Sequence, residues 1–249
     1  MRSLNVQYNG QLCEIPFDGF KVFQTKNPNL FTRDFFNFIQ KGMFANVAIR
    51  SEQTMLISDF SKTSDFFTFS KNSEFTKMII EEIVNSKLID PAVSAQIVQK
   101  INELFGLQIL EENINFYKLL SHIFSISEDE YLAKESFLKI INSSLLTKKT
   151  TFIFNDISWL NYNDIAAFLN LHNFIFITND FRKNIKSINL IESVVLLADT
   201  ILEIASKEKF VSFIEKKMNS LLTPNNLENF FNCSNDKTSC EIYAHLLTF

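Results

Sequence analysis

The segments TTFIFN (150–155) and NFIFIT (173–178) decide the fold class of this chain. Each is a short, mainly apolar run, which is typical of a strand that is buried on both faces of a sheet. Between them, NYND (161–164) provides the side chains that begin a helix. Two such strands joined by a helix predict a right-handed parallel crossover. A third apolar run, SVVLL (193–197), extends the predicted parallel sheet.

The beginning of the chain predicts more strands. Asn9-Gly10 separates alternating runs at 3–8 and 11–15, and this pair favours the tight turn of a hairpin because both residues tolerate positive φ. Asp18-Gly19 predicts a second turn, followed by a strand over 20–24. Helical spacing of apolar residues then predicts a helix over 29–40, which Gly42 closes, and further strands over 46–50 and 54–59.

The middle and the end of the chain are predicted to be helical. Helices are expected over 74–86 and 116–124 and after Asp90-Pro91, while the capping box at 127–130 begins another that buries Tyr131 and Phe137. Residues 200–249 carry further helix starts at Thr223 and Thr238. The predicted organisation is an α/β head over 1–61 and 148–199, a helical leg inserted at 62–147, and a C-terminal helical extension over 200–249.

Composition narrows the class of protein. The chain has 249 residues, 46% of them hydrophobic, which is enough to bury a sizeable core. Its net charge is −4, and only the first 50 residues carry a basic surplus. Three cysteines without a disulfide spacing favour a reducing compartment. No apolar run approaches the length of a membrane span, so we expect a cytoplasmic protein with no membrane partner.

Glycine spacing excludes the common nucleotide sites. The four glycines lie at 10, 19, 42 and 106, so neither a Gly-x-Gly-x-x-Gly loop nor a Walker A loop can be written. His122, His172 and His245 belong to no metal-binding spacing, and Cys233 and Cys240 have no second pair. We therefore expect no nucleotide cofactor and ordinary structural roles for the histidines.

Two alternatives for function remain open from the residues alone. Asp156 and Asp180 each follow a predicted strand, where they could serve a metal-dependent hydrolase or simply cap the next turn. The 28 phenylalanines could give a protein–protein adaptor with a Phe-rich binding face, although their spacing favours the core. Basic residues near the strands could instead contact phosphates without sequence preference.

A series of segments resembles a known family. These are TMLISD (54–59), the run 66–77 that leads into a long helical region, KKTTFIFN (148–155), WLN (159–161) and NFIFI (173–177). In order and spacing across about residues 20–190 they resemble the type II-A CRISPR spacer-acquisition accessory proteins, the Csn-two family.

The resemblance implies a fold and a function. The head would be a degenerate P-loop-like α/β fold with a mixed or parallel sheet, and the protein a non-catalytic homotetrameric ring that binds ends of double-stranded DNA. It would act in CRISPR adaptation and antiviral defence, beside the integrase pair and the RNA-guided nuclease. The candidate DNA contacts are Lys21, Lys26, Lys41, Lys148, Lys149, Arg182 and Lys183.

Two departures from the family pattern stand out. The acid-rich segment that binds Ca²⁺ in the family falls near 108–116, where the sequence is shortened to QILEENINF. Glu111 and Glu112 are the metal ligands that the resemblance leaves there. The segment 200–249 extends beyond the expected end of shorter members, where it could cover the head or contribute an interface.

Overall fold

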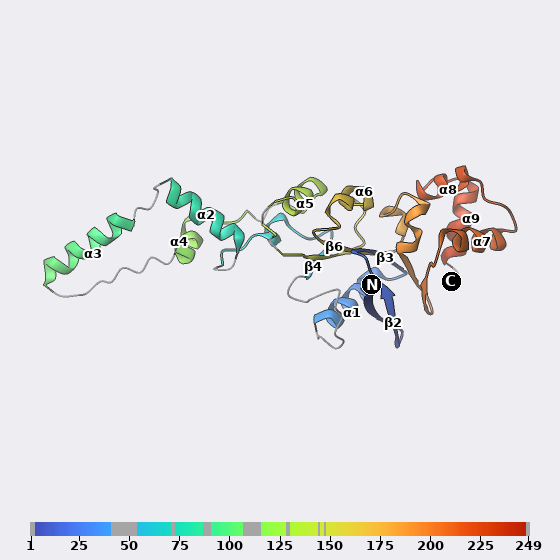
Figure 1. Cartoon of the computed structure of the whole chain (residues 1–249), viewed down its shortest axis with the longest axis horizontal. Coiled ribbons are helices and arrows are strands. Elements are labelled where there is room, and N and C mark those ends of the chain that lie inside the picture. The colour runs from blue at the N-terminus through green and yellow to red at the C-terminus, as the bar shows by residue number, and fades with distance from the viewer. Residues whose placement is uncertain are drawn as a thin grey trace. The chain divides into compact units, whose positions relative to one another are not determined.

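The computed structural model describes residues 3–40, 54–70, 73–86, 91–106, 116–127, 130–143, 145–146 and 148–247 (Figure 1). The chain divides into two compact units. Met1–Ser61, Leu132–Asn142 and Lys148–Phe249 form a sheet unit, and Lys62–Tyr131 with Ser143–Thr147 form a helical unit. The segment 132–142, which the sequence placed in the leg, and the extension 200–249 both belong to the sheet unit.

A six-stranded sheet organises the sheet unit, in the order β4-β5-β6-β3-β7-β8. The central strand β3 (Phe20–Thr25) pairs in parallel with β6 (Asn173–Thr178) and with β7 (Val194–Leu197). Strands β5 (Thr151–Asn155) and β4 (Thr54–Ile57) continue the parallel set beyond β6. The edge strand β8 (Ile201–Glu203) is antiparallel to β7. The fold is therefore a mixed α/β fold, as the sequence predicted.

Strands β5 and β6 separate their apolar side chains by type. Because successive residues of a strand point to opposite faces, the runs FIF and FIFI place phenylalanines on one face and isoleucines on the other. In parallel register, Phe154 stacks on Phe176 with ring centroids 4.6 Å apart. On the opposite face, Ile153, Ile175 and Ile177 join one buried cluster. Both faces of the sheet must therefore be covered.

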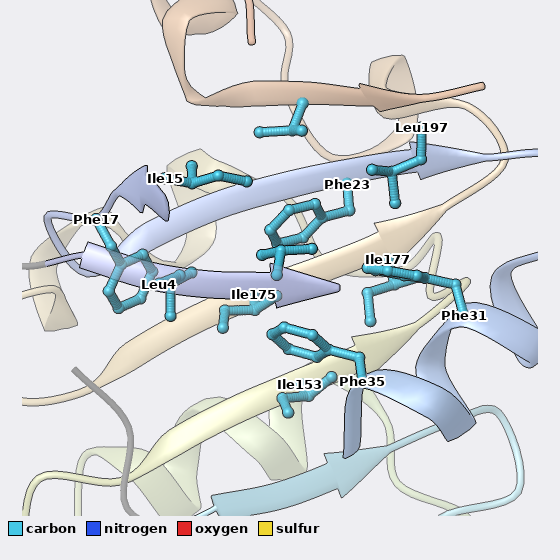
Figure 2. Close-up of a cluster of buried hydrophobic side chains, with 12 residues drawn as sticks. Leu4, Ile15, Phe17, Phe23, Phe31, Phe35, Ile153, Ile175, Ile177 and Leu197 are labelled. Carbon is cyan, nitrogen blue, oxygen red and sulfur yellow. The ribbon is translucent and has the colours of Figure 1, made fainter. Parts of the chain in front are cut away.

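A hairpin and a helix cover the isoleucine face (Figure 2). The hairpin consists of β1 (Ser3–Tyr8) and β2 (Gln11–Pro16), and the helix is α1 (Pro28–Gln40). The hairpin turn has φ of 47° at Asn9 and 76° at Gly10, the positive values that the sequence pair predicted. The side chains buried against the sheet by these elements, and by Phe17 directly after β2, are Leu4, Val6, Ile15, Phe17, Phe31 and Phe35.

Helix α5 (Lys134–Ile141) covers the phenylalanine face. Its Phe137 is fully buried, and its ring meets those of Phe152 and Phe154 edge-on at 5.2 and 5.4 Å. The short helix α6 (Tyr162–Ile165) continues into the 3-10 turn η3 (Ala166–Phe168) and leads from β5 to β6. Figure 1 shows α5 and α6 on the side of the sheet opposite α1.

The C-terminal helices close the sheet unit. After β6 the chain makes the 3-10 turns η4 (Phe181–Lys183) and η5 (Ile188–Ser193) before it enters β7. The last helices are α7 (Lys207–Met218), α8 (Pro224–Phe231) and α9 (Lys237–Leu247). The rings of Phe230 and Phe231 lie 6.1 and 6.0 Å from that of Phe181. The extension thus packs on the segment that follows β6.

The helical unit contains η2 (Thr63–Phe66), α2 (Glu74–Asn85), α3 (Pro91–Phe105) and α4 (Phe116–Ile123). Ser73 caps α2 by accepting the Thr76 amide at 3.4 Å, and the buried Thr76 hydroxyl donates to the Thr68 carbonyl at 2.9 Å. Phe67 and Phe69 pack against Phe75. In the part of the chain that the structure describes, no helix is long and apolar enough to cross a membrane.

Three local predictions differ from the structure. The helix expected from the capping box at 127–130 begins at Lys134 instead, and Tyr131 is 64% exposed and forms an antiparallel bridge with Lys62. This bridge takes the backbone of residue 131 out of a helix. Strand β8 lies in a region predicted to be wholly helical. The strand predicted over 46–50 and the helix end at Gly42 lie outside the described residues.

His172 fixes the position of the main chain directly before β5. Its imidazole is 3% exposed, and its Nδ1 accepts the amide N–H of Thr150 at 3.3 Å. Removal from water lowers the pKa of His172, with the charge of Lys149 acting in the same direction, and these effects outweigh an opposing hydrogen bond to the backbone of Ile141. The residue therefore stays neutral and couples the end of α5 to the start of β5.

Replacing Phe137 tests the cover on the phenylalanine face. Because its side chain is fully buried between the sheet and α5, Phe137→Ala should lower the free energy of unfolding by about 3–5 kcal/mol in urea denaturation. Phe60, which is 82% exposed, provides the matched control, and Phe60→Ala should change stability by less than about 0.5 kcal/mol. Equal losses in the two variants would contradict this packing.

His172 should make stability depend on pH. Its pKa in the folded protein lies below the ordinary 6.5, so the unfolded chain binds the proton more readily. The stabilisation is complete above about pH 6.5 and is lost as the pH falls through the depressed folded value. Unfolding measured between pH 8 and 5 should show this decline. His172→Gln should flatten it, whereas the exposed His122→Gln should leave it unchanged.

Candidate functional site

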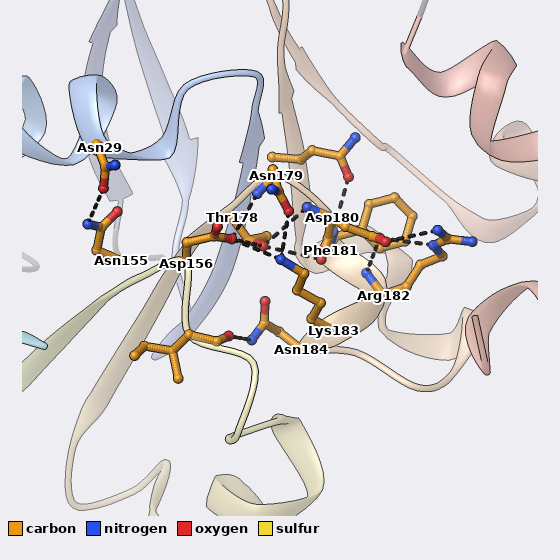
Figure 3. Close-up of polar contacts among 12 residues, drawn as sticks. Asn29, Asn155, Asp156, Thr178, Asn179, Asp180, Phe181, Arg182, Lys183 and Asn184 are labelled. Carbon is orange, nitrogen blue, oxygen red and sulfur yellow. Dashed lines mark hydrogen bonds and ion pairs between the residues drawn. The ribbon is translucent and has the colours of Figure 1, made fainter. Parts of the chain in front are cut away.

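Polar side chains gather where the parallel strands end. The carboxyl ends of β3, β5 and β6 share one edge of the sheet, the edge at which open α/β sheets bind ligands. Gln24 and Thr25 end β3, Asn155 ends β5, and Thr178 ends β6. We call this the carboxyl edge. Both aspartates that the sequence singled out, Asp156 and Asp180, lie here (Figure 3).

Asp156 is the acceptor of a local network. Its φ is 53°, and its amide donates to the Ile177 carbonyl at 2.7 Å. Its Oδ1 accepts the Thr178 hydroxyl at 3.1 Å, the Asn179 amide at 3.3 Å and the Lys183 ammonium at 3.2 Å. Lys183 also donates to Asn179 Oδ1 at 2.8 Å. A metal ion at Asp156 would have to compete with an ammonium group that is already in place.

Asp180 is held even more firmly. Its Oδ1 caps η4 by accepting the Arg182 amide at 3.0 Å, and its two oxygens accept Arg182 Nε at 2.9 Å and Nη2 at 2.8 Å. This bidentate pair is mostly shielded from water, since Arg182 is 9% exposed. Of the two roles left open by the sequence, the structure places Asp180 in the capping role.

Aromatic rings from the C-terminal helices enclose the Arg182 guanidinium. Its central carbon lies 4.1 Å from the ring centroid of Tyr243 and 4.9 Å from that of Phe230. Burial alone would lower the pKa of Arg182, but the hydrogen bonds and charge of Asp180 outweigh it and raise the pKa. The Tyr243 hydroxyl donates to the Asn179 carbonyl at 3.2 Å. The extension thus contributes directly to the carboxyl edge.

The connection from β3 to α1 is short and internally satisfied. Only Lys26 and Asn27 separate the two elements. Asn27 Oδ1 accepts the Leu30 amide at 3.2 Å and its carbonyl accepts the Phe31 amide at 3.2 Å, while Pro28 has no N–H to offer. The Asn27 amide itself donates to Thr25 Oγ1 at 3.4 Å. The amides of Asn27, Leu30 and Phe31, at the position where a nucleotide loop would hold phosphates, are therefore already used.

A second group of amides links β5 to α1. The Asn155 Nδ2 donates to Asn29 Oδ1 at 2.7 Å, and the Thr32 hydroxyl donates to Asn155 Oδ1 at 3.0 Å. These side chains ended as neighbours although more than a hundred positions separate them in the sequence. In the sequence, Asn155 stood out only as a polar residue at the end of an apolar strand. No feature of the sequence pointed to Asn29.

Two cavities flank Lys26 at the carboxyl edge. One, of about 510 Å³, lies against the hairpin turn at Tyr8 and Asn9. The other, of about 480 Å³, lies between the ends of β3 and β7, where the chain leaves the sheet in opposite directions. We call it the switch cavity. Its lining includes Gln24, Lys26, Asn179, Lys183, Leu197 and Tyr243.

The candidate DNA contacts separate into two groups. Lys26 and Lys183 lie at the carboxyl edge, whereas Lys148 and Lys149 precede β5 at the opposite, amino edge. Five residues of β5 place the two edges about 16 Å apart, so these lysines do not form one compact patch. Lys148 is exposed and Lys149 is half-buried. Lys139 is exposed near the end of α5, and no signal in the sequence pointed to it.

Two candidates are buried, and a third falls outside the described residues. Lys21 is 7% exposed, its Nζ donates to the Glu192 carbonyl at 3.3 Å, and removal from water lowers its pKa against the opposing charges of Glu203, Asp18 and Glu192. Neither Lys21 nor Arg182 presents its charge to a phosphate. Because side chains alternate between the two faces of a strand, Lys21 of β3 points inward. A count of basic residues does not show this orientation. Lys41 lies outside the described residues.

The calcium candidates Glu111 and Glu112 also lie outside the described residues. Within the ranges that the structure covers, no three histidine, cysteine, aspartate or glutamate side chains are grouped so that they could hold a metal ion. Of the phenylalanines whose side chains are described, only Phe60 and Phe124 are exposed, so those residues form no broad aromatic face.

Comparison with known proteins gives a likeness of fold. No protein-family profile matches the chain. No curated protein matches it either. Among solved structures, the crystal structure of Stu0660 of Streptococcus thermophilus is similar, with a TM-score of 0.63 and 13% sequence identity. The likeness covers 100% of this chain and 93% of that one. It therefore extends over the helical unit and the C-terminal helices as well as the sheet.

The Asp180–Arg182 pair should be a large contributor to stability. Arg182→Ala would leave a carboxylate shielded from water without its cation, so it should lower the free energy of unfolding by about 3–5 kcal/mol. Arg33 forms an exposed pair with Asp34, and Arg33→Ala should cost no more than about 1 kcal/mol. Chemical denaturation of both variants decides the point, and a loss at Arg182 no larger than that at Arg33 would contradict it.

Proposed function

We propose that this chain is a non-catalytic, double-stranded DNA-binding protein of the Csn-two type. In this proposal the sheet unit is a P-loop-like head that has lost its nucleotide loop. Four copies form a ring that holds DNA ends during CRISPR adaptation, beside the integrase pair and the RNA-guided nuclease. The segments that resemble this family and the full-length likeness of fold to Stu0660 support the proposal.

The ion pairs at the carboxyl edge support the proposal that the protein is non-catalytic. This is where an α/β sheet assembles catalytic groups, yet Asp156 is paired with Lys183 and Asp180 with Arg182. In the β3–α1 connection, Asn27 accepts the amides of Leu30 and Phe31, and these amides are therefore not offered to a phosphate. A hydrolase would need one of these carboxylates for a metal or a proton, and each is already bound to a cation. The hydrolase alternative is therefore the less favoured.

The amino edge is the favoured DNA contact in this proposal. Exposed Lys148 and half-buried Lys149 lie there, close in the chain to exposed Lys139, and His172 ties the end of α5 to the start of β5 beside them. Lysine contacts to phosphates give affinity without sequence preference, which suits a protein that slides on duplex DNA. The overall charge of −4 requires such local concentration of cations.

Removing the amino-edge lysines should weaken DNA binding uniformly. Lys148→Ala with Lys149→Ala removes about two phosphate contacts, so the slope of log affinity against log salt should fall by about 2 for every sequence tried. The pair Lys216→Ala with Lys217→Ala on α7 removes the same charge from another exposed site and is the control. Binding is measured by fluorescence anisotropy on linear duplex DNA and on a closed circle.

The outcomes separate the parts of the proposal. A mass in solution of about four times 28.9 kDa, with preference for linear DNA over the circle, is expected of a ring. If the Lys148/Lys149 variant binds as the unmodified protein does, the amino edge is not the contact. A monomer that ignores DNA at low salt would overturn the proposed function.

A further inference from the structure

The switch cavity is lined by side-chain hydrogen-bond donors that the described part of the protein does not use. Lys26 is exposed and has neither an ion-pair nor a hydrogen-bond partner among the described residues, although it lines the cavity. Gln24 is 5% exposed, and its Oε1 accepts the Phe181 amide at 3.1 Å. Its Nε2 donates to no atom in the described part of the chain. Gln24 lines the cavity, so this unused donor is available to a ligand bound there.

The other charged groups leave these donors unused. Lys183 uses two of its three N–H bonds on Asp156 and Asn179, so one remains. Asp180, the acidic residue of the lining, is occupied by the bidentate contact with Arg182. Tyr243 donates its hydroxyl proton to the Asn179 carbonyl. The cavity therefore favours a ligand that brings negative charge and several acceptor oxygens.

We propose that the switch cavity binds a phosphate monoester, with Lys26 and Gln24 as its principal contacts. A monoester carries up to two charges and three terminal oxygens, which match donors that come from β3 and from the turn after β6. The apolar Leu196, Leu197 and Leu246 line the same cavity and suit the less polar body of the ligand. At about 480 Å³, the cavity has the size of a small-molecule site.

This site differs from a nucleotide loop in position and donors. A nucleotide loop holds phosphates with main-chain amides between strand and helix, and here Asn27 and Thr25 accept three of those amides. The proposed contacts are side chains on the β7 side of the same connection. Two sources can supply the ligand: a free nucleotide, or the 5′-phosphate at the end of a DNA strand. The first source does not depend on the proposed DNA binding.

The first experiment is calorimetric titration of the full chain with thymidine 5′-monophosphate, thymidine and inorganic phosphate. The monophosphate should bind saturably and phosphate should compete with it, whereas thymidine should bind at least about 10-fold more weakly. Lys26→Ala should weaken binding by about 10-fold or more. Gln24→Glu, which keeps the acceptor for the Phe181 amide but replaces the donor with a negative charge, should do the same. Lys216→Ala, which removes an exposed lysine on α7 away from the cavity lining, is the control and should bind as the unmodified protein does.

The second experiment compares a blunt duplex with 5′-phosphates and the same duplex with 5′-hydroxyls. A preference for the phosphorylated duplex that disappears in Lys26→Ala assigns the site to DNA ends, even if the free nucleotide does not bind. Equal binding of both duplexes together with no saturable binding of the monophosphate overturns the proposal. Monophosphate binding that is unchanged in Lys26→Ala also overturns it. Binding to a closed circle reports separately on the proposed DNA contact at the amino edge.

Discussion

The rest of the structure depends on the burial of β5 and β6 from both sides. Their alternation of phenylalanine and isoleucine gives the sheet two apolar faces of different shape, and neither tolerates water. Flat aromatic rings on one face receive Phe137 of α5 edge-on. Branched side chains on the other face receive the hairpin and α1. Because these covers come from the N-terminal residues and from a segment before β5, the burial of two short strands fixes the path of much of the chain.

The carboxyl edge of the sheet is stabilised by ion pairs between the protein's own side chains. Each aspartate there is matched by a cation from the 3-10 turn that follows β6, and α9 places Tyr243 over one of these pairs. Such pairs remove the free carboxylates that catalysis would use. Among the described residues, Lys26 on this edge and Lys148 on the other form no ion pair.

Local sequence signals predicted local structure well. Asn9-Gly10 predicted the hairpin because both positions need positive φ, and the buried runs predicted β5, β6 and β7. The predicted start of α5 was wrong because the backbone of Tyr131 pairs with that of Lys62, which is far away in the chain. This pairing overrides the local capping-box signal. Strand β8 was missed because only its pairing with β7 makes it a strand.

At the site, the positions of Asp156 and Asp180 followed from the predicted strands. The contact between the Arg182 guanidinium and Tyr243 joins η4 to α9, so it leaves no local pattern in the sequence. The inward orientation of Lys21 likewise depends on the faces of β3, which become defined only when both are covered.

The central position of β3 has a consequence for how the chain is made. Its two neighbours, β6 and β7, come from residues 173–197, while β3 itself ends at Thr25. At ribosomal speeds of about 5–20 residues per second, the strand is made roughly 7–35 s before its partners exist. During that interval an apolar strand with two unsatisfied edges must be shielded, and the hairpin and α1, which are local in sequence, are the elements available to pack on it. The hairpin and α1 thus cover β3 until the strands that complete the sheet around it have been made.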